Sequence, residues 1–255
     1  MHLNAHPHSS WAEVYDLAYE QSFGEFYRQL TDVTVQVIAE RAHPPARIVD
    51  FGAGTGRLSI PLAELGFDVV AVDPCAEMLN QLEQKKQRGA IRTVCSKMED
   101  FSSNEQFDVA LCVFTVLLYL LDDESLTKAL TAAHSSLKSG GILLLDIPSK
   151  AIFHGHSTND HLIERSVSVT NQAGNIFNYR EELTVKNPNG EGAKYQDNFL
   201  IRYWPHEHVT KILQEVGFDL DADLSDRFSA AGSHYHILRK TDHFDRADAA
   251  ATRGD

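Results

Sequence analysis

The sequence predicts an α/β fold, a doubly wound and mostly parallel sheet of seven strands that is followed by an antiparallel β insertion. Two observations predict it. From Arg47 to Pro148, short apolar runs alternate with segments of helical periodicity, which is the pattern of repeated strand–helix units. From Ala151 to Tyr203, apolar and polar residues alternate one by one, which is typical of strands with one covered face.

The composition limits the partners and the compartment. The chain has 23 basic and 36 acidic residues and a net charge of −13, which disfavours nucleic acid because phosphates require a basic surface. No apolar segment approaches the ~20 residues that span a bilayer, and the start MHLNAHPHSS lacks the regions of a secretory signal. Cys75, Cys95 and Cys112 have no metal-like spacing, so we expect reduced thiols in a cytoplasmic protein without membrane contact.

The stretch from Arg47 to Gly66, RIVDFGAGTGRLSIPLAELG, predicts a buried strand, a turn and a helix. Gly52, Gly54 and Gly56 fall in the turn, where glycine permits positive φ and lets a ligand approach the backbone. Unpaired N–H groups at the start of the helix face the same place. We therefore expect this loop to bind a small, polar, nucleoside-like molecule.

The spacing of these residues discriminates between cofactors. A dinucleotide fingerprint requires glycine at the sixth position counted from Gly52, where this chain has Arg57. The carboxylate of Asp50, just before the turn, would repel a pyrophosphate and attract an ammonium group. Asp73 ends the strand Asp68 to Val72, ~20 residues beyond the first glycine, where a carboxylate can bind both ribose hydroxyls. These features favour S-adenosylmethionine, which has an ammonium and a sulfonium but no phosphate.

Several motifs follow one another in a recognisable order: VDFGAGTG, Asp73-Pro74 before AEMLNQL, SKMEDF, FDVALCVF and LKSGGILLLD. In this order they resemble the class I S-adenosylmethionine-dependent methyltransferases, strongly over residues 48–148 and weakly around WPHEHVTKILQEVGF. The resemblance implies a Rossmann-like methyltransferase fold, S-adenosyl-L-methionine as cofactor and S-adenosyl-L-homocysteine as product. The layout of the chain is most similar to the sugar N,N-dimethyltransferases of antibiotic biosynthesis and, more distantly, to glycine N-methyltransferases.

The strand ends and the resemblance together predict the cofactor site. In the resembled family, the loop at residues 98–100 holds the adenine between an apolar side chain and a carboxylate; an exposed acidic loop is the alternative. The carboxyl end of the strand Phe107 to Phe114 lies where open α/β sheets bind ligands, although its aromatic residues could equally be core. The predicted cofactor-binding residues are Tyr15, Tyr19, Asp50, Gly52, Ala53, Gly54, Gly56, Asp73, Pro74, Met78, Met98, Glu99, Asp100, Phe114, Thr115 and Tyr119.

Residues 1–46 are predicted to form a helical lid on the core at 47–150. Apolar side chains recur at helical spacing from Trp11 to Tyr27, a second helix is expected from Asp32 to Arg41, and the first ten residues are expected to be mobile. The resemblance implies that Tyr15 and Tyr19 close over cofactor and acceptor. The alternative is a surface helix whose apolar stripe packs on the core.

Residues 151–204 are predicted to form the antiparallel insertion. Residues 177–185 and 195–203 alternate, with a turn at Asn187 to Gly192, and Val167 and Val169 suggest a third strand. In the resembled family such an insertion covers the acceptor pocket or forms a subunit interface, so we expect a homodimer through it. Residues 205–240 are expected to return to the core as a helix and a hairpin, before a disordered tail at 241–255.

The expected chemistry needs little from the protein. A sulfonium methyl is already activated, so in-line displacement requires mainly an aligned nucleophile stripped of water. An amine acceptor must also be neutral, and the general-base candidates are Tyr15 and His154, with His156 and His206 as further candidates. The His-x-His pairs have no cysteine or carboxylate at ligand spacing, so no functional metal is expected.

These observations predict a methyltransferase that acts on a nitrogen, or less readily on an oxygen or carbon, of a small-molecule metabolite. The alternative from another class is a protein that binds S-adenosylmethionine without turnover, as a sensor or a partner subunit. A nicotinamide oxidoreductase is disfavoured by Arg57 at the last glycine position.

Overall fold

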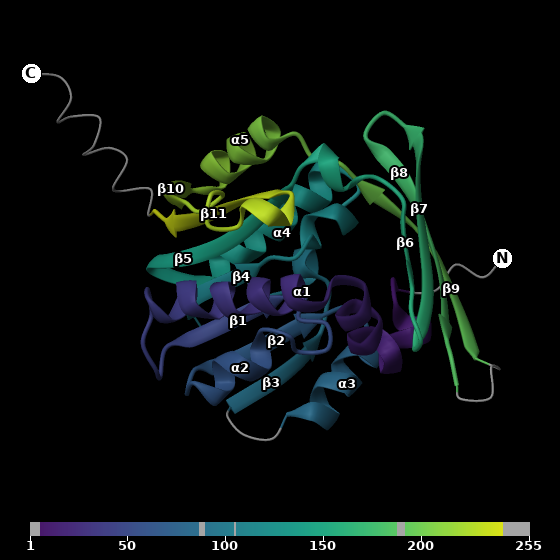
Figure 1. Cartoon of the computed structure of the whole chain (residues 1–255). Coiled ribbons are helices and arrows are strands. Elements are labelled where there is room, and N and C mark those ends of the chain that lie inside the picture. Colours follow the sequence, from purple (N-terminus) through teal and green to yellow (C-terminus); the bar gives the residue numbers. More distant parts are fainter. Residues whose placement is uncertain (1–5, 87–89, 105, 188–191, 242–255) are drawn as a thin grey trace, which may run out of the picture.

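Two sheets form the framework of the protein (Figure 1). The structure is a computed structural model that describes residues 6–86, 90–104, 106–187 and 192–241. A seven-stranded sheet has the order β10-β11-β5-β4-β1-β2-β3, and a separate four-stranded sheet has the order β6-β7-β8-β9. The expected fold class, a mostly parallel α/β sheet with an antiparallel insertion, is therefore confirmed.

The large sheet is parallel from β3 to β5; at one edge β11 runs antiparallel to β5, and β10, antiparallel to β11, runs in the same direction as β5. Its central strands are apolar on both faces, as buried parallel strands should be, and Ile48 and Val49 have no exposed surface. The strands are β1 (Arg47–Phe51), β2 (Asp68–Asp73), β3 (Ala90–Cys95), β4 (Phe107–Cys112), β5 (Leu137–Pro148), β10 (Phe218–Asp223) and β11 (Ser233–Lys240).

Helices cover both faces of this sheet. The apolar side chains of α1 (Tyr15–Ala39), α2 (Ser59–Glu64) and α3 (Ala76–Lys85) pack on one face, and those of α4 (Asp123–Ser136) and α5 (His206–Val216) on the other. Short 3-10 helices lie in the connections: η1 (Ser9–Val14), η2 (Met98–Asp100), η3 (Val116–Tyr119), η4 (Lys150–Ile152) and η5 (Ser229–Ala231). Within the described residues, no helix combines the length and the apolar character needed to cross a membrane.

The N-terminal region differs from the prediction in two respects. The expected second helix, Asp32 to Arg41, is present but begins earlier and ends at Ala39, because α1 consists of two helical segments that meet at a non-helical kink at Gly24. Its bend is absorbed at Gly24, whose φ of 48° lies in the left-handed region that glycine enters at low cost. The first ten residues were expected to be mobile; residues 1–5 lie outside the described residues, whereas His8 is only 6% exposed and η1 begins at Ser9.

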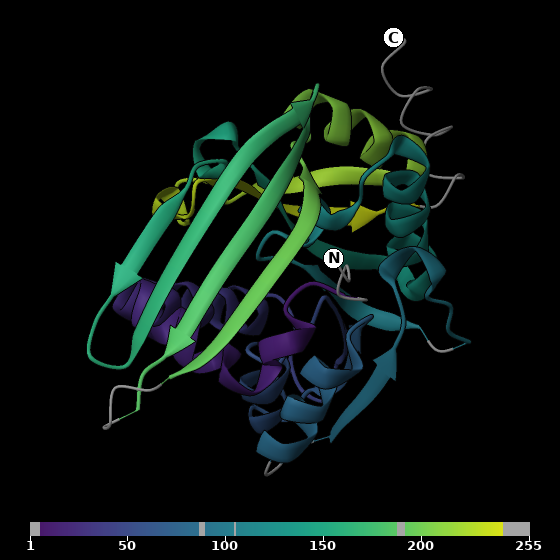
Figure 2. The same cartoon turned by 90° about the vertical axis from the view of Figure 1, so that its right-hand side faces the viewer.

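The insertion forms a curved antiparallel sheet beside the core (Figure 2). Its strands are β6 (His156–Asn159), β7 (Ile163–Ala173), β8 (Ile176–Val185) and β9 (Ala193–Arg202). The sequence did not predict β6, whose HSTN sequence lacks apolar alternation. Residues 188–191 of the expected turn, and residues 242–255 of the expected disordered tail, lie outside the described residues.

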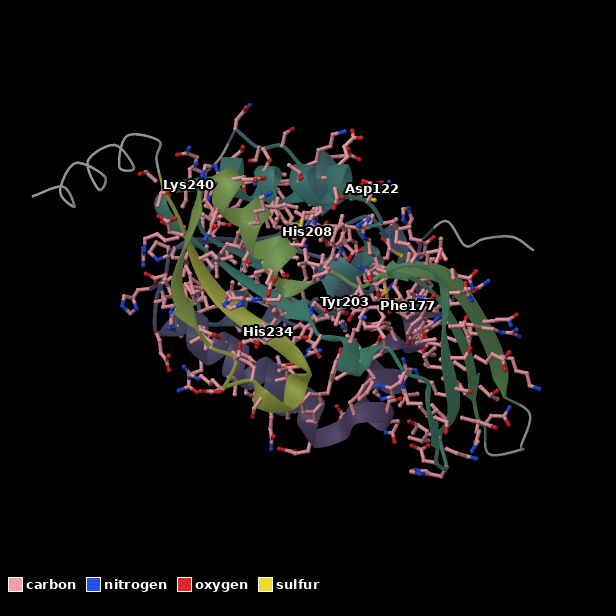
Figure 3. All side chains as sticks on the ribbon, turned by 90° about the horizontal axis from the view of Figure 1, so that it is seen from above. Asp122, Phe177, Tyr203, His208, His234 and Lys240 are labelled. Carbon is pink, nitrogen blue, oxygen red and sulfur yellow. The ribbon has the colours of Figure 1, made fainter. Side chains whose placement is uncertain are left out.

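The two sheets are joined at one end and separated at the other. At the joined end, the ring of Phe153 contacts the rings of Phe177 and Tyr203, whose positions near the core are labelled in Figure 3. At the other end, η1 and the start of α1 lie between the core and the insertion (Figure 1), where Trp11 and Ala18 pack against Ile163 and Leu183. The lid segment is therefore enclosed between two sheets.

Candidate functional site

The glycine loop follows β1 at the carboxyl edge of the large sheet. Gly52, Gly54 and Gly56 have φ values of 72°, 54° and 90°, so each adopts the left-handed conformation that the sequence predicted. A Cβ on Gly52 would come within 2.4 Å of Val116 Cγ2, and one on Gly56 within 2.7 Å of Leu82 Cγ. On Gly54 it would meet only Met78 Cε at 3.6 Å and its own loop carbonyl at 4.0 Å, so Gly54 is the glycine with space beside it.

Two buried carboxyl groups end the strands beside this loop. Asp73 accepts hydrogen bonds from the N–H of Gly54 at 2.9 Å and the N–H of Cys75 at 2.8 Å, and burial raises the pKa of its carboxyl. Each oxygen keeps a second lone pair, which suits ribose hydroxyls. Asp50 accepts from the Ser59 hydroxyl at 2.6 Å, and burial raises its pKa to about 7. The hydrogen bond from Ser59 to Asp50 therefore connects the end of β1 to the start of α2.

The expected adenine loop forms η2, next to the carboxyl end of β4. Met98 is buried, with its sulfur 3.7 Å from that of Cys112. Glu99 is partly buried, and Asp100 is exposed. This arrangement provides the apolar side chain and the carboxylates that the resemblance implied, and their contact with adenine stays a prediction.

The strand β4 ends at Cys112, two residues earlier than expected, because the chain turns sharply at Phe114 and Thr115. Both residues have positive φ, 64° and 72°, which is uncommon outside glycine and is found at functional sites. The turn is held by Asp146, a buried carboxylate that accepts from the Thr115 N–H at 3.1 Å. Burial raises the pKa of Asp146 to about 7.

The lid is held against this edge by Arg57. Its guanidinium carbon lies 3.6 Å from the ring centroids of both Tyr27 and Phe114, and its Nε donates to Thr31 at 2.7 Å. A second tie is the Thr55 hydroxyl, which donates to Asp16 at 2.6 Å. Arg57, the residue that breaks the dinucleotide fingerprint, thus holds α1 against the glycine loop.

The lid tyrosines come together with Tyr119 in an aromatic group. Tyr15 and Tyr19 stack at 4.3 Å between ring centroids, and the ring of His8 lies 5.5 Å from Tyr15 and 6.5 Å from Tyr119. Burial raises the pKa of Tyr15 well above its ordinary value. Its hydroxyl therefore keeps its proton at neutral pH, which makes Tyr15 a hydrogen-bond donor rather than a general base.

Beside the aromatic group lies a buried set of polar side chains, Arg165, Glu181, Asp197 and His8, which we call the charged cluster. Arg165 donates from Nε to Glu181 Oε1 at 2.5 Å, and each side chain is 1% exposed. Asp197 Oδ2 accepts from the His8 backbone N–H at 2.6 Å and from Trp11 Nε1 at 3.0 Å. Burial and the nearby Arg165 lower the pKa of His8 to about 3, so its ring is neutral.

The remaining histidine candidates lie in different places. His154 does not join the site residues, because it is exposed and its Nδ1 donates to the Ala151 carbonyl at 2.6 Å. His156 reaches the charged cluster, with Nε2 3.3 Å from Arg165 Nη1. His206 lies on α5, 2.9 Å from His236 of β11, in the part of the molecule marked by His208 and His234 in Figure 3. In the described residues, no group of three metal-ligating side chains could hold a metal ion.

The charged cluster and Asp146 are functional candidates that the sequence analysis missed. A signal was present, because Arg165, Glu181 and Asp197 occupy inward positions of strands whose other inward residues are apolar. A charged residue in such a register requires a buried partner. The partner could not be foreseen, since His8 is 189 residues from Asp197 in sequence.

Comparison with known proteins indicates a methyltransferase, as the fold and the glycine loop do. Residues 48–141 match a family model described as a methyltransferase domain. The glycine/sarcosine N-methyltransferase of Parasynechococcus marenigrum (strain WH8102) is 25% identical over 255 aligned positions, which cover 91% of this chain and 87% of the relative. That of Aphanothece halophytica is 34% identical over 141 positions, or 53% of this chain and 50% of the relative.

Solved structures share the fold over most of the chain. An S-adenosylmethionine-dependent methyltransferase from Clostridium acetobutylicum ATCC 824 superposes with a TM-score of 0.79 at 18% identity, covering 90% of this chain and 99% of that one. CalS10, an amino pentose methyltransferase from Micromonospora echinaspora solved with S-adenosylmethionine bound, has a TM-score of 0.71 at 21% identity and covers 94% and 100%.

The strand order, the glycine loop and these matches define a Rossmann-like methyltransferase. Residues 48–141 form a methyltransferase domain, the chain as a whole is similar to class I S-adenosylmethionine-dependent methyltransferases, and its cofactor is S-adenosylmethionine. The residues present fit this cofactor, because Gly54 leaves space at the loop and Asp73 offers free lone pairs there. The relatives are named as enzymes, which favours an enzyme over the non-catalytic binding protein that the sequence left open.

Proposed function

We propose that this methyltransferase acts on the nitrogen of a small-molecule amine. The observation that supports it is the charged cluster, where two buried carboxyl groups, Glu181 and Asp197, are neighbours across β8 and β9 and Glu181 forms an ion pair with the buried Arg165. The cluster thus brings two acidic side chains together with one arginine, and the low pKa of His8 leaves its ring without a charge. A buried site with this balance favours a cationic or hydrogen-bond-donating group over an anion.

The relatives support nitrogen as the receiving atom. Two of them are named glycine/sarcosine N-methyltransferases, and one structural neighbour is named the sugar N-methyltransferase KedS8. Methyl transfer to oxygen or carbon is the less favoured alternative within the same fold. The acceptor in this proposal is a small metabolite rather than a nucleic acid, which the net charge of −13 disfavours.

The residues of this chain have distinct parts in the proposed reaction. When bound, S-adenosylmethionine supplies a methyl group that its sulfonium has already activated. The glycine loop and Asp73 position the cofactor, while the Tyr15 and Tyr19 rings close the site and exclude water, which strengthens electrostatic interactions inside it. Alignment of the two reactants can supply on the order of 7–11 kcal/mol of the barrier, so the protein acts mainly by positioning.

Two measurements test the proposal in sequence. Calorimetric titration with S-adenosylmethionine and with S-adenosylhomocysteine is expected to show micromolar binding of both. A panel of small primary and secondary amines, each paired with the hydroxyl compound of the same skeleton, is then incubated with cofactor and analysed by mass. The proposal expects a gain of one methyl mass in amines only, and methylation of the hydroxyl compounds alone would contradict it.

The proposal also covers compartment and assembly. We propose a cytoplasmic homodimer formed through the insertion, whose strand β9 has one edge without a neighbouring strand within the described residues. Cys75, Cys95 and Cys112 are free thiols, which suits a reducing compartment. Sedimentation analysis is expected to give twice the chain mass of 28.5 kDa, and a monomer at all concentrations would contradict the dimer.

A further inference from the structure

Two buried acceptor atoms in the charged cluster have no hydrogen-bond partner. They are Glu181 Oε2 and His8 Nδ1, which lie 3.6 Å apart. Unpartnered buried polar atoms are rare in proteins, because each costs about 1–3 kcal/mol of lost solvation. Their presence side by side indicates a place where a ligand supplies the missing group.

The neighbouring bonds decide what that group must be. Glu181 Oε1 is engaged by Arg165 Nε, which leaves Oε2 as a free acceptor. His8 Nε2 lies 3.2 Å from the Tyr119 hydroxyl, and in the tautomer that donates this proton to Tyr119, Nδ1 is an acceptor too. Asp197 Oδ2, another acceptor, is 3.7 Å from Nδ1. The missing partner is therefore a group with at least two N–H bonds.

We propose that the amine of the methyl acceptor binds between Glu181 Oε2 and His8 Nδ1, and that Glu181 takes a proton from it before methyl transfer. This inference rests on the proposed N-methylation and deepens it by naming the atoms that hold the amine. Residues 6–14 then form one wall of the acceptor site, in addition to the lid tyrosines.

The protons and electrons balance in this scheme. An acceptor that enters as R–NH3⁺ gives one proton to Glu181 and becomes R–NH2, whose lone pair forms the N–C bond. The S–C bond breaks as its electron pair stays on sulfur, and the product is R–NH2⁺–CH3. Burial raises the pKa of Glu181, which makes it a better proton acceptor than an exposed glutamate, while His8 remains a neutral acceptor.

The rival occupant is a carboxylate bound to Arg165. Three of the five guanidinium N–H bonds already have a neighbour, since Nε donates to Glu181, Nη1 lies 3.3 Å from His156 Nε2, and Nη2 lies 3.4 Å from the Tyr179 hydroxyl. A carboxylate would also lie beside Glu181 and Asp197. The arrangement therefore favours an amine over an acid at this site.

The test is calorimetric titration of the full chain, loaded with S-adenosylhomocysteine, with methylamine and separately with acetate. Methylamine is the smallest ammonium probe, and it is expected to bind in the millimolar range, the ceiling for so few atoms, whereas acetate is expected not to bind. The inference would be overturned if acetate bound and methylamine did not, or if methylamine gave no heat of binding.

Two variants assign the binding to these atoms. Glu181→Gln removes the charge and is expected to weaken methylamine binding at least about 10-fold, the lower range for a hydrogen bond to a charged group. Because this variant also disturbs the ion pair with Arg165, His8→Gly is the second test. Glycine tolerates the left-handed conformation of residue 8, φ 65°, and has no side-chain acceptor in place of Nδ1, so the same loss is expected.

The matched control is His161→Gly, which changes an exposed histidine outside the cluster and is expected to bind methylamine as the wild type does. Methylamine binding that persists in both cluster variants would contradict the inference while leaving N-methylation intact. The opposite result is also informative. If both variants lose methylamine binding but no amine in the panel is methylated, the amine site is supported and the proposed function is contradicted.

Discussion

The cofactor loop and the charged cluster are both buried and acidic, but they are assembled in different ways. At the cofactor loop, Asp73 accepts from backbone N–H groups 2 and 19 residues away, within one strand–turn–helix unit and its neighbour. In the charged cluster, Asp197 accepts from residues 189 and 186 positions away, which belong to the lid. The cofactor loop is therefore formed within the core, whereas the complete charged cluster requires contact between the N-terminal segment and the insertion.

The difference extends to hydrogen bonding. Asp73 and Asp50 have donors for their carboxylates, so the cofactor loop is complete in itself. The charged cluster retains the unpartnered Glu181 Oε2 and His8 Nδ1. We infer that the cofactor edge is preorganised, whereas the acceptor side reaches full hydrogen bonding only with a bound molecule. Substitutions at the cofactor loop should therefore affect cofactor binding, and substitutions in the charged cluster should affect closure of the lid.

The largest expected effect is on cofactor binding, from Asp73→Ala. The variant loses the carboxylate expected to bind the ribose and leaves the Gly54 and Cys75 N–H groups without their acceptor. With about 1.5–3 kcal/mol for each hydrogen bond to a charged group, affinity for S-adenosylmethionine should fall at least about 100-fold by calorimetry. Glu64→Ala, exposed on α2, is the control with unchanged affinity, and an equal affinity in both variants would refute the assigned role.

Within the glycine loop, one substitution is expected to lower mainly stability and another mainly cofactor affinity. Both glycines have positive φ, so alanine at either position adds left-handed strain of about 1–2 kcal/mol. Gly56→Ala also places Cβ 2.7 Å from Leu82 Cγ, so its free energy of unfolding, measured with denaturant, should fall by about a further 1–3 kcal/mol. Gly54→Ala has space for Cβ, so only the strain should lower its stability. Its main cost should be cofactor affinity, because the added methyl group occupies the open side of the loop. Equal affinities for the two variants would contradict this division.

A smaller effect is expected where the lid meets the insertion. Asp197→Ala removes the acceptor for the His8 N–H and Trp11 Nε1, at about 1–3 kcal/mol for each donor left unpaired. The N-terminal segment should then open more often, seen as faster limited proteolysis near residue 11. Cofactor affinity should change less than about threefold, because the glycine loop is untouched. A loss of cofactor affinity as large as that of Asp73→Ala would show that the two places are not separable.

A final expected effect concerns the dependence of stability on pH. Burial raises the folded-state pKa of Asp50 from 3.8 to about 7, so the native state binds more protons than the unfolded state between these values. The contribution of Asp50 to the free energy of unfolding is therefore full below 3.8 and is lost as pH rises to about 7. Asp50→Asn, which can still accept from Ser59, should flatten this slope in urea unfolding without abolishing it, because Asp146 has the same shift. An unchanged slope would contradict burial as the cause.

Much of the cofactor side could be predicted because local sequence encodes it. The positive φ values of Gly52, Gly54 and Gly56 require glycine, and the carboxylate of Asp73 must end a strand to reach the loop. Such constraints act within a few residues, so a motif records them. The contacts of the individual predicted residues with cofactor stay predictions. Tyr15 and Tyr19 were placed correctly on a helix next to one another, although the kink at Gly24, where the second helical segment begins, was not foreseen.

The acceptor side could be predicted only in outline. Alternation located β7, β8 and β9, but it could not tell that His8 would enter the charged cluster, nor that His154 would remain exposed while His156 contacts Arg165. Pairing between distant residues depends on which side chains compensate each other's burial, and no spacing rule reports that.

The sequence by itself determined the sheet, the glycine turn and the class of cofactor, because periodicity and backbone conformation are local properties. The tertiary structure decided the acceptor side, because burying Arg165, Glu181 and Asp197 is tolerable only where strands β7 to β9 and the lid enclose them together. The energy of a buried charge depends on its neighbours in space, and those neighbours are set when the chain folds.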